Sequence, residues 1–248
     1  MLLSSKIGEG SFGKIYKGKL FDIPCIYKVE MPPHNHLKRE HDVYKLLKDI
    51  NGFPKTYLYI EKLDKNILIM EDLNNSLNNL FKQNSSHFAI NFIYNIARQT
   101  IRLLNILYKH RIVHRDIKPG NLMYKDGMIY LIDFGLASVN NNYNTSKFMG
   151  TLRYASSNIH NGIEASYRDD LISLGYTLMY FANGGQLPWM NITITDNNKK
   201  RRIIGSIKNN NQYKENTRIN EYMRYVTQLM LEDVPNYDYL ITIFSDTL

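Results

Sequence analysis

The residues at 114–121, H-R-D-I-K-P-G-N, carry side chains that are suited to the transfer of a phosphoryl group. Asp116 can orient an incoming hydroxyl group and accept its proton. Lys118 can neutralise the charge that develops on the transferring group. Asn121 offers an oxygen ligand to magnesium, a hard cation that prefers oxygen. A polar loop that carries these residues by chance is the alternative, and the length of the match argues against it.

A second motif, D-F-G at residues 133–135, directly follows the apolar residues 129–132, which predict a strand. A carboxylate at the end of a strand is well placed to bind a metal ion that bridges phosphates. The tripeptide alone is a weak signal, but at this distance from the first motif it becomes a strong one. We therefore expect Asp116, Asn121 and Asp133 to gather around one pocket.

The sequence G-E-G-S-F-G at residues 8–13 contains Gly8, Gly10 and Gly13, whose backbone can approach phosphates without a Cβ clash. The same spacing marks dinucleotide-binding folds, in which it opens a helix. Here the alternating residues 14–20 follow and predict a returning strand. For the motif alone, an ordinary tight hairpin is an equally good interpretation.

Lys28 lies in the middle of the apolar run at residues 26–30, where a lysine is costly unless its charge is used. We expect it to hold nucleotide phosphates, with Glu40 on the following helix as the partner that keeps it in place. Taken alone, a lysine on the solvent face of an amphipathic strand is the better interpretation.

The N-terminal part of the chain reads mostly as strands, over residues 3–70, with a compact buried strand at residues 66–70. One helix interrupts these strands between residues 35 and 49. The apolar residues that recur there at helical spacing are Leu37, Val43, Leu46 and Leu47.

The rest of the chain has a helical character, because apolar periodicity predicts helices at residues 88–110, 171–181 and 222–231. The sequence thus predicts a small strand-rich lobe that joins a larger helical lobe near residues 71–74. A cleft between two lobes is a common place for a ligand.

Composition fits these expectations: the chain has 248 residues, 44% hydrophobic and 22% charged, which suits one large domain or two packed lobes. The only cysteine, Cys25, is expected in the core of a protein from a reducing compartment. Neither a signal peptide nor a membrane-spanning stretch is apparent, so we expect a soluble intracellular protein of the cytoplasm or nucleus. The net charge of +8 favours acidic partners: nucleic acid, anionic lipid, or acidic and phosphorylated protein.

The order of the motifs resembles that of the protein kinase family: glycine loop, strand lysine, helix glutamate, H-R-D-x-K-x-x-N and D-F-G. Most kinases then carry A-P-E, whereas residues 150–158 read G-T-L-R-Y-A-S-S-N. This stretch is similar to G-T-A-R-Y-A-S-I-N of the casein kinase 1 family. The likeness continues at residues 162–164, 168–176, 187–189 and 233–240. It covers essentially the whole chain but is patchy between residues 191 and 223.

The resemblance implies an α+β, bilobal protein kinase fold, with a small N-lobe antiparallel β-sheet and one helix, and a larger, mostly helical C-lobe. It places the N-lobe at residues 1–70, the hinge at 71–74 and the C-lobe at 75–248. It implies ATP and Mg²⁺ as cofactors, with Asn121 and Asp133 as metal ligands. The ATP-binding residues that it implies are Ile7, Gly8, Gly10, Gly13, Ile15, Lys28, Glu40, Met70, Glu71 and Leu73.

Further roles follow from the same resemblance. Met70 would gate the back of the adenine pocket, and Asp170 would brace the catalytic loop from the large C-lobe helix. Gly120 stands where the family usually has aspartate, at a position without a direct chemical role, so we expect activity to survive. Leu152 replaces a small residue near the substrate groove and is expected to alter specificity.

Casein kinase 1 enzymes often prefer a substrate that is phosphorylated or acidic a few residues before the target serine or threonine. The resemblance assigns this anion to Arg153, and to Lys200 by ungapped counting from Trp189, with Arg115 as a further candidate. A planar guanidinium suits phosphate well. For the basic run 199–202, a solvated helix face or a nuclear address is the alternative.

The resemblance implies a non-specific serine/threonine protein kinase that acts as a monomer on acidic or phosphorylated proteins, with Asp116 and Lys118 as catalytic residues. Thr145, Ser146 and Thr151 could be phosphorylated, but their presence does not indicate an activating phosphorylation site. Constitutive activity is therefore expected. A pseudokinase scaffold is the alternative, although no catalytic position has been lost. A kinase of small molecules is a second alternative. Nucleic-acid binding rests on net charge alone and ranks last, and no membrane association is expected.

Overall fold

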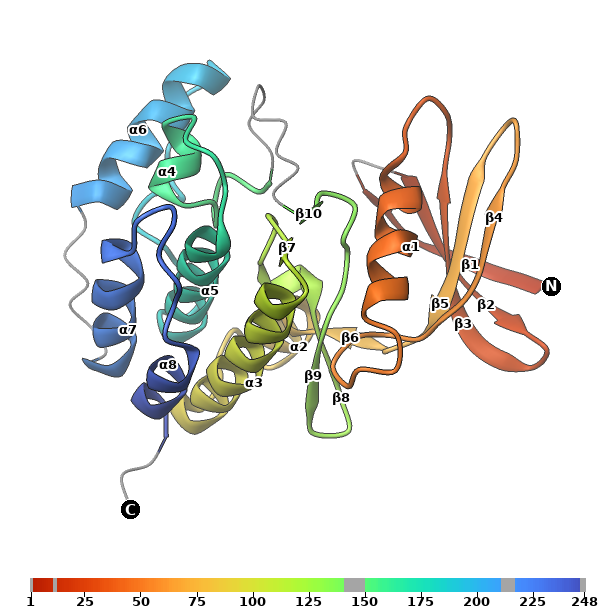
Figure 1. Cartoon of the computed structure of the whole chain (residues 1–248), viewed down its shortest axis with the longest axis horizontal. Coiled ribbons are helices and arrows are strands. Elements are labelled where there is room, and N and C mark those ends of the chain that lie inside the picture. Colours follow the sequence, from red (N-terminus) through yellow and green to blue (C-terminus); the bar gives the residue numbers. More distant parts are fainter. Residues whose placement is uncertain (1, 11–12, 141–149, 211–216, 246–248) are drawn as a thin grey trace. The chain divides into compact units, whose positions relative to one another are not determined.

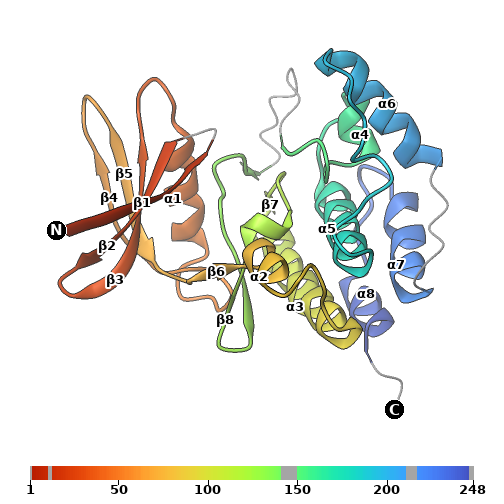
Figure 2. The ribbon, with the colours of Figure 1, turned by 180° about the vertical axis from the view of Figure 1, so that it is seen from behind.

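A computed structural model describes residues 2–10, 13–140, 150–210 and 217–245. The chain divides into two compact units. The first comprises Met1–Asn75 with Met123–Ala137, and the second comprises Ser76–Leu122 with Ser138–Leu248. The first is rich in strands and the second in helices, as Figures 1 and 2 show, so the predicted α+β class is confirmed.

The first unit is built on a five-stranded antiparallel sheet in the order β1-β2-β3-β5-β4 (Figure 1). The predicted strands at residues 14–20, 26–30 and 66–70 are all present in it. The strands are β1 (Leu2–Gly10), β2 (Gly13–Leu20), β3 (Ile23–Glu30), β4 (Thr56–Glu61) and β5 (Asn66–Glu71).

The two faces of this sheet carry different side chains, because side chains alternate along each strand. One face carries a buried cluster of Cys25, Tyr27, Ile67 and Ile69. Lys28 alternates with these residues and therefore points to the other face. Its cross-strand partners Ile15 and Leu68 accompany it there.

Helix α1 (His36–Leu46) packs against β3, β4 and β5 and lies along the sheet in Figure 1. Glu30 caps its N-terminus, since the backbone N–H groups of His36 and Leu37 donate to the Glu30 carboxylate at 3.0 and 3.1 Å. Of the four apolar residues at helical spacing, three are buried, whereas Leu46, the last residue of the helix, is 49% exposed.

The second unit is organised around α5 (Tyr167–Ala182), which packs against α3 (Ile90–Lys109) and α7 (Thr217–Gln228) (Figure 2). The three helices predicted in this region are therefore present. The third was predicted to reach residue 231, but it ends at Gln228, and Met230 beyond it is 68% exposed.

The other helices and strands complete the described part of the chain. Within the described residues, no helix combines the length and the apolar character that crossing a membrane requires. The remaining elements are β6 (Asn75–Ser76), α2 (Leu77–Gln83), β7 (Ile112–Val113), η1 (Pro119–Asn121), β8 (Leu122–Lys125), β9 (Met128–Leu131), β10 (Ser138–Val139), α4 (Ser157–His160), α6 (Asn197–Asn210) and α8 (Tyr237–Ile243).

Candidate active site

Lys28 of β3 and Glu40 of α1 form a buried ion pair in the first unit, with Nζ and Oε1 2.6 Å apart. The side chain of Glu40 is 1% exposed and that of Lys28 is 11% exposed. The structure therefore brings together the two residues that the sequence paired. The solvent-facing alternative for Lys28 was wrong, because the sheet buries this side chain.

The charges around Lys28 favour its ammonium form. Burial by itself lowers the pKa of Lys28, but the nearby carboxylates of Glu40 and Asp133 outweigh burial and raise it. For Glu40 the effects have the opposite signs: burial raises its pKa, and the positive charge of Lys28 lowers it. At a separation of 2.6 Å we assign the pair as ammonium and carboxylate, because each ion then satisfies the other.

Asp133 follows β9 in a strained backbone conformation, with φ of +73°, in the left-handed region that non-glycine residues rarely adopt. Its backbone N–H donates to Tyr44 Oη at 3.3 Å, and Phe134 packs edge-on against the ring of Tyr44. A Cβ atom on Gly135 would lie 3.5 Å from Asp133 Oδ1 and 3.2 Å from the side chain of His36. Such strain persists where the surroundings hold it, and it is concentrated at functional sites.

The glycine motif begins in β1 and ends at the first residue of β2, where Gly10 pairs with Gly13. Ser11 and Phe12, between these two glycines, lie outside the described residues. A Cβ atom on Gly13 would come within 2.2 Å of the carbonyl oxygen of Val29, so this position requires glycine. The predicted returning strand is β2, which excludes the helix of a dinucleotide-binding motif.

The other predicted ATP-binding residues lie in β1, β2 and β5 and in the segment that follows β5. Ile7 is 49% exposed and Ile15 is half-buried, whereas Met70 and Leu73 are buried. Glu71 Oε1 pairs with Lys125 Nζ at 2.8 Å. The sequence analysis missed Lys125, and its position, far along the chain from Glu71, offered no local signal.

Asp116 is the centre of a polar cluster in the second unit. Lys118 Nζ donates to its Oδ2 at 2.5 Å, and the hydroxyl of Thr151 donates to its Oδ1 at 2.8 Å. Lys118 Nζ also lies 3.2 Å from Thr151 Oγ1. Asn121 Nδ2 donates to the carbonyl oxygen of Asp116 at 2.9 Å, and this contact directs the amide oxygen of Asn121 away from Asp116. Asp116, Lys118 and Asn121 are therefore together, as predicted.

The loop that carries Asp116 is anchored to α5. Asp170, in the first turn of that helix, accepts hydrogen bonds from the backbone N–H groups of His114 and Arg115 at 2.7 and 2.8 Å. Burial raises the pKa of Asp170 to about 7, and the two N–H donors oppose the shift. The predicted bracing contact is thus present. It holds Arg115 at a φ of +69°.

Arg153 and Lys200 line the same groove of about 760 Å³, which also includes Leu152. Arg153 is exposed and Lys200 is half-buried. Arg201 of the basic run 199–202 also lines the groove, whereas the further candidate Arg115 does not. The structure therefore brings together the two principal residues of the predicted anion site.

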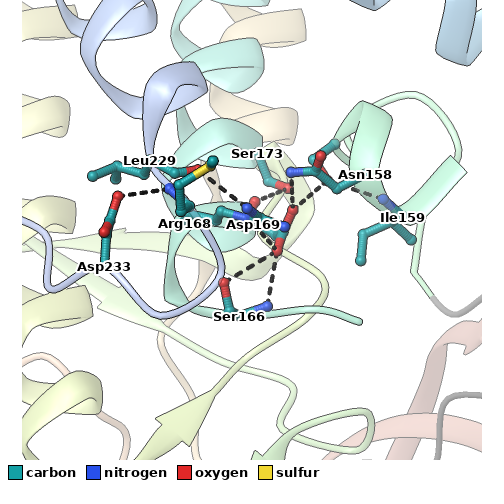
Figure 3. Close-up of polar contacts among 10 residues, drawn as sticks. Asn158, Ile159, Ser166, Arg168, Asp169, Ser173, Leu229 and Asp233 are labelled. Carbon is teal, nitrogen blue, oxygen red and sulfur yellow. Dashed lines mark hydrogen bonds and ion pairs between the residues drawn. The ribbon is translucent and has the colours of Figure 1, made fainter. Parts of the chain in front are cut away.

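The segment after Arg153 is tied to the first turn of α5, a connection that the sequence analysis missed (Figure 3). Asp169 Oδ1 accepts hydrogen bonds from Ser156 Oγ at 2.5 Å and Asn158 Nδ2 at 3.1 Å. Its Oδ2 accepts the backbone N–H of Ser166 at 2.8 Å, which completes a capping box. The S-x-x-D spacing at residues 166–169 was the signal that could have revealed this role.

The donor chemistry fits magnesium. Asn121 offers an amide oxygen and Asp133 a carboxylate, both of which are hard oxygen ligands. Among the residues that the structure describes, no three His, Cys, Asp or Glu side chains cluster to hold a metal by themselves. Magnesium commonly takes only one or two protein ligands and keeps waters and substrate phosphates as the others. That Asp116 and Asn121 of one unit meet Asp133 of the other stays a prediction.

Comparison with known proteins now assigns the family. Residues 2–237 match the family described as protein kinase domain. The chain therefore belongs to the protein kinase family, and the predicted fold, bilobal and α+β, is confirmed.

The curated relatives carry one common name. The chain is 34% identical over 270 residues to casein kinase I homolog 3 of Schizosaccharomyces pombe, covering 99% of this chain and 61% of the relative. It is 32% identical to casein kinase I homolog 2 of the same organism, covering 98% of this chain and 61% of that protein. It is 32% identical to casein kinase I homolog RAG8 of Kluyveromyces lactis, covering 95% of this chain and 48% of that protein. The chain thus spans between about half and three fifths of these relatives, and it is similar to casein kinase I homologs, as the motifs indicated.

Proposed function

We propose that this chain is a non-specific serine/threonine protein kinase, which transfers the γ-phosphoryl group of ATP to serine or threonine hydroxyl groups of proteins. The observation that carries the proposal is the cluster around Asp116. A hydroxyl group, that of Thr151, already donates to Asp116 Oδ1 at 2.8 Å. A substrate serine or threonine would make the same interaction and give up its proton to this carboxylate.

Lys118 supports that step electrostatically. Its ammonium lies 2.5 Å from Asp116 Oδ2 and so places a positive charge beside the proton acceptor. A cation fixed at this point stabilises negative charge that develops on a transferring phosphoryl group. Asp170 contributes by orienting the loop through the backbone of His114 and Arg115.

The residues of the first unit are proposed to bind the nucleotide. Lys28, held by Glu40, would bind the phosphates together with the glycine turn, and residues 71–74 would act as the hinge. Magnesium, when bound, neutralises phosphate charge, and the oxygens of Asn121 and Asp133 would hold it. The strained backbone of Asp133 is consistent with a position under functional constraint.

The transfer itself is tested with radiolabelled ATP and casein. We expect the chain to label casein, and Asp133→Ala to reduce labelling to background. Nucleotide binding without labelling of casein or of any peptide would favour the scaffold alternative. Labelling of a sugar or an antibiotic but not of peptides would favour a kinase of small molecules.

We further propose that the enzyme, as a monomer, favours acidic or phosphorylated protein substrates. The support is the groove that Arg153 and Lys200 line together, where cations can pair with an anionic side chain. The test uses one peptide in phosphorylated and unphosphorylated forms. Because Lys200 lines the groove, we expect Lys200→Gln to raise the KM of the phosphopeptide about 10-fold.

Arg202 provides the matched control, because it lies on the same helix, is exposed and is not among the groove residues. Arg202→Gln removes the same charge and is expected to change that KM by less than about twofold. Equal effects of the two variants would show that residues 199–202 act only as a charged helix face.

A further inference from the structure

Lys208 of α6 is a lysine buried beneath the segment that carries Arg153, and it is 3% exposed. Its Nζ donates to the carbonyl oxygens of Leu152 at 3.0 Å, Arg153 at 3.1 Å and Ala155 at 2.6 Å. An ammonium group has three N–H donors, and these three carbonyls can accept all of them. His160 Nε2 also lies 3.2 Å from Nζ. Among the described residues, no carboxylate pairs with it. The ammonium therefore serves to hold the backbone of this segment.

Aromatic faces and a histidine complete the surroundings. Lys208 Nζ lies 4.8 Å from the ring centroids of both Tyr176 and Trp189, within the range of cation–π attraction. Burial, assisted by the charge of Lys208, lowers the pKa of His160 to about 3, so this imidazole is neutral. Its Nε2 lies 3.2 Å from the carbonyl oxygen of Leu152 and can donate to it. Burial lowers the pKa of Lys208 well below its usual value. The three carbonyl oxygens and the two ring faces around Nζ are the groups that favour its charged form.

Arg153 is the residue on which these contacts converge. Its carbonyl oxygen accepts from Lys208 Nζ and from Trp189 Nε1, the latter at 2.8 Å. Its side chain is exposed and lines the groove. The backbone of Arg153 is thus fixed from the buried side, while its side chain, whose guanidinium lies 6.0 Å from the ring centroid of Tyr154, is exposed on the other.

We propose that Lys208 is a positioning residue for substrate recognition, which fixes residues 152–155 so that Arg153 is preorganised to bind an anionic group of the substrate. The inference rests on the proposed preference for acidic or phosphorylated substrates. Lys208 itself touches no substrate. Its effect arises because a fixed cation binds an anion without the cost of first ordering the loop that carries it.

Lys208→Met tests the proposal, because methionine keeps the unbranched side chain up to its terminal atom and removes the charge and the donors. We expect the KM of the phosphopeptide to rise about 10-fold, with a smaller change in kcat and in the KM of the unphosphorylated peptide. The control is Lys109→Met, since Lys109 is an exposed lysine at the end of α3. It is expected to leave both KM values within about twofold of the wild type.

A double-mutant cycle separates positioning from general stability. In an Arg153→Gln background, Lys208→Met is expected to leave the KM of the phosphopeptide unchanged, because the group that it positions is gone. Independent, multiplicative losses in the two variants would overturn the proposal. So would an equal loss of kcat/KM for both peptides.

Two further outcomes are informative. If Lys208→Met fails to fold, Lys208→Gln removes the charge while keeping a polar end group, and an unchanged KM of the phosphopeptide in that variant overturns the proposal. A wild-type enzyme without preference for the phosphopeptide refutes the proposed substrate preference, and the inference falls with it. If Lys208→Met keeps the full preference of the wild type for the phosphopeptide, the positioning role of Lys208 is refuted, and the proposed substrate preference stands.

Discussion

Lys28 and Glu40 hold one another in the interior of the first unit, with Nζ and Oε1 2.6 Å apart. Since Lys28 belongs to β3 and Glu40 to α1, the pair joins the sheet to the helix. We predict that Lys28→Met lowers kcat/KM for ATP by about 10²-fold or more, because phosphate positioning is lost and Glu40 is left as a buried unpaired charge. Steady-state kinetics with ATP as the varied substrate measure this effect.

The control for that variant is Lys19→Met, since Lys19 is an exposed lysine at the end of β2. We expect it to keep kcat/KM within about twofold of the wild type. Full activity of Lys28→Met would contradict the role assigned to the pair.

Gly150 brings Thr151 to the catalytic cluster, and its backbone φ is +99°. A Cβ atom there would lie 2.7 Å from the carbonyl oxygen of Arg115, so the segment must move. We predict that Gly150→Ala lowers kcat by about 10²-fold, because a small displacement disturbs the contacts of Asp116. The measurement is peptide phosphorylation at saturating ATP.

Gly162→Ala is the matched control, because Gly162 has a φ of +78° but no atom within 4 Å of a Cβ built there. The variant Gly162→Ala places a side chain at a positive φ, as Gly150→Ala does, but without a steric clash. We expect it to reduce the free energy of unfolding by about 1 kcal/mol and to leave kcat nearly unchanged. Equal losses of kcat in the two variants would show that strain alone is responsible.

His160 predicts a dependence of stability on pH. Its folded-state pKa of about 3 lies below the ordinary histidine value of about 6.5, because burial and the neighbouring Lys208 disfavour the imidazolium. Between these values the unfolded chain binds more protons, so the free energy of unfolding falls as the pH falls. We predict that this slope, at most about 1.4 kcal/mol per pH unit, is reduced in His160→Gln. Urea unfolding at several pH values measures it, and identical slopes would contradict the assignment.

Local motifs made much of the site predictable. Asp116, Asn121 and Asp133 belong to motifs whose spacing is specific, and Lys28 is a lysine within an apolar run. Glu40 followed from its place on the helix after Lys28. The strands and long helices followed from periodicity, since burial on one face leaves a repeat that can be counted.

The connections between distant segments were not predictable in the same way. Lys208 reads as one more polar residue at the end of a basic helix, and only packing against residues 152–155 makes it a buried cation. Asp169 likewise reads as an acid at a helix start, and its hydrogen bond to Asn158 depends on tertiary placement. The exposure of Leu46 shows the same limit, because sequence spacing does not say which of two adjacent leucines faces the sheet.

The most direct test of the account is the rate of phosphoryl transfer from ATP to a serine or threonine peptide by the wild type and by Asp116→Asn. Asparagine keeps the shape of the side chain but cannot accept the proton. We expect measurable transfer by the wild type and a kcat lower by about 10²-fold or more in the variant. Equal kcat values for the two proteins would contradict the role of Asp116, and absence of transfer by the wild type would contradict the enzyme itself.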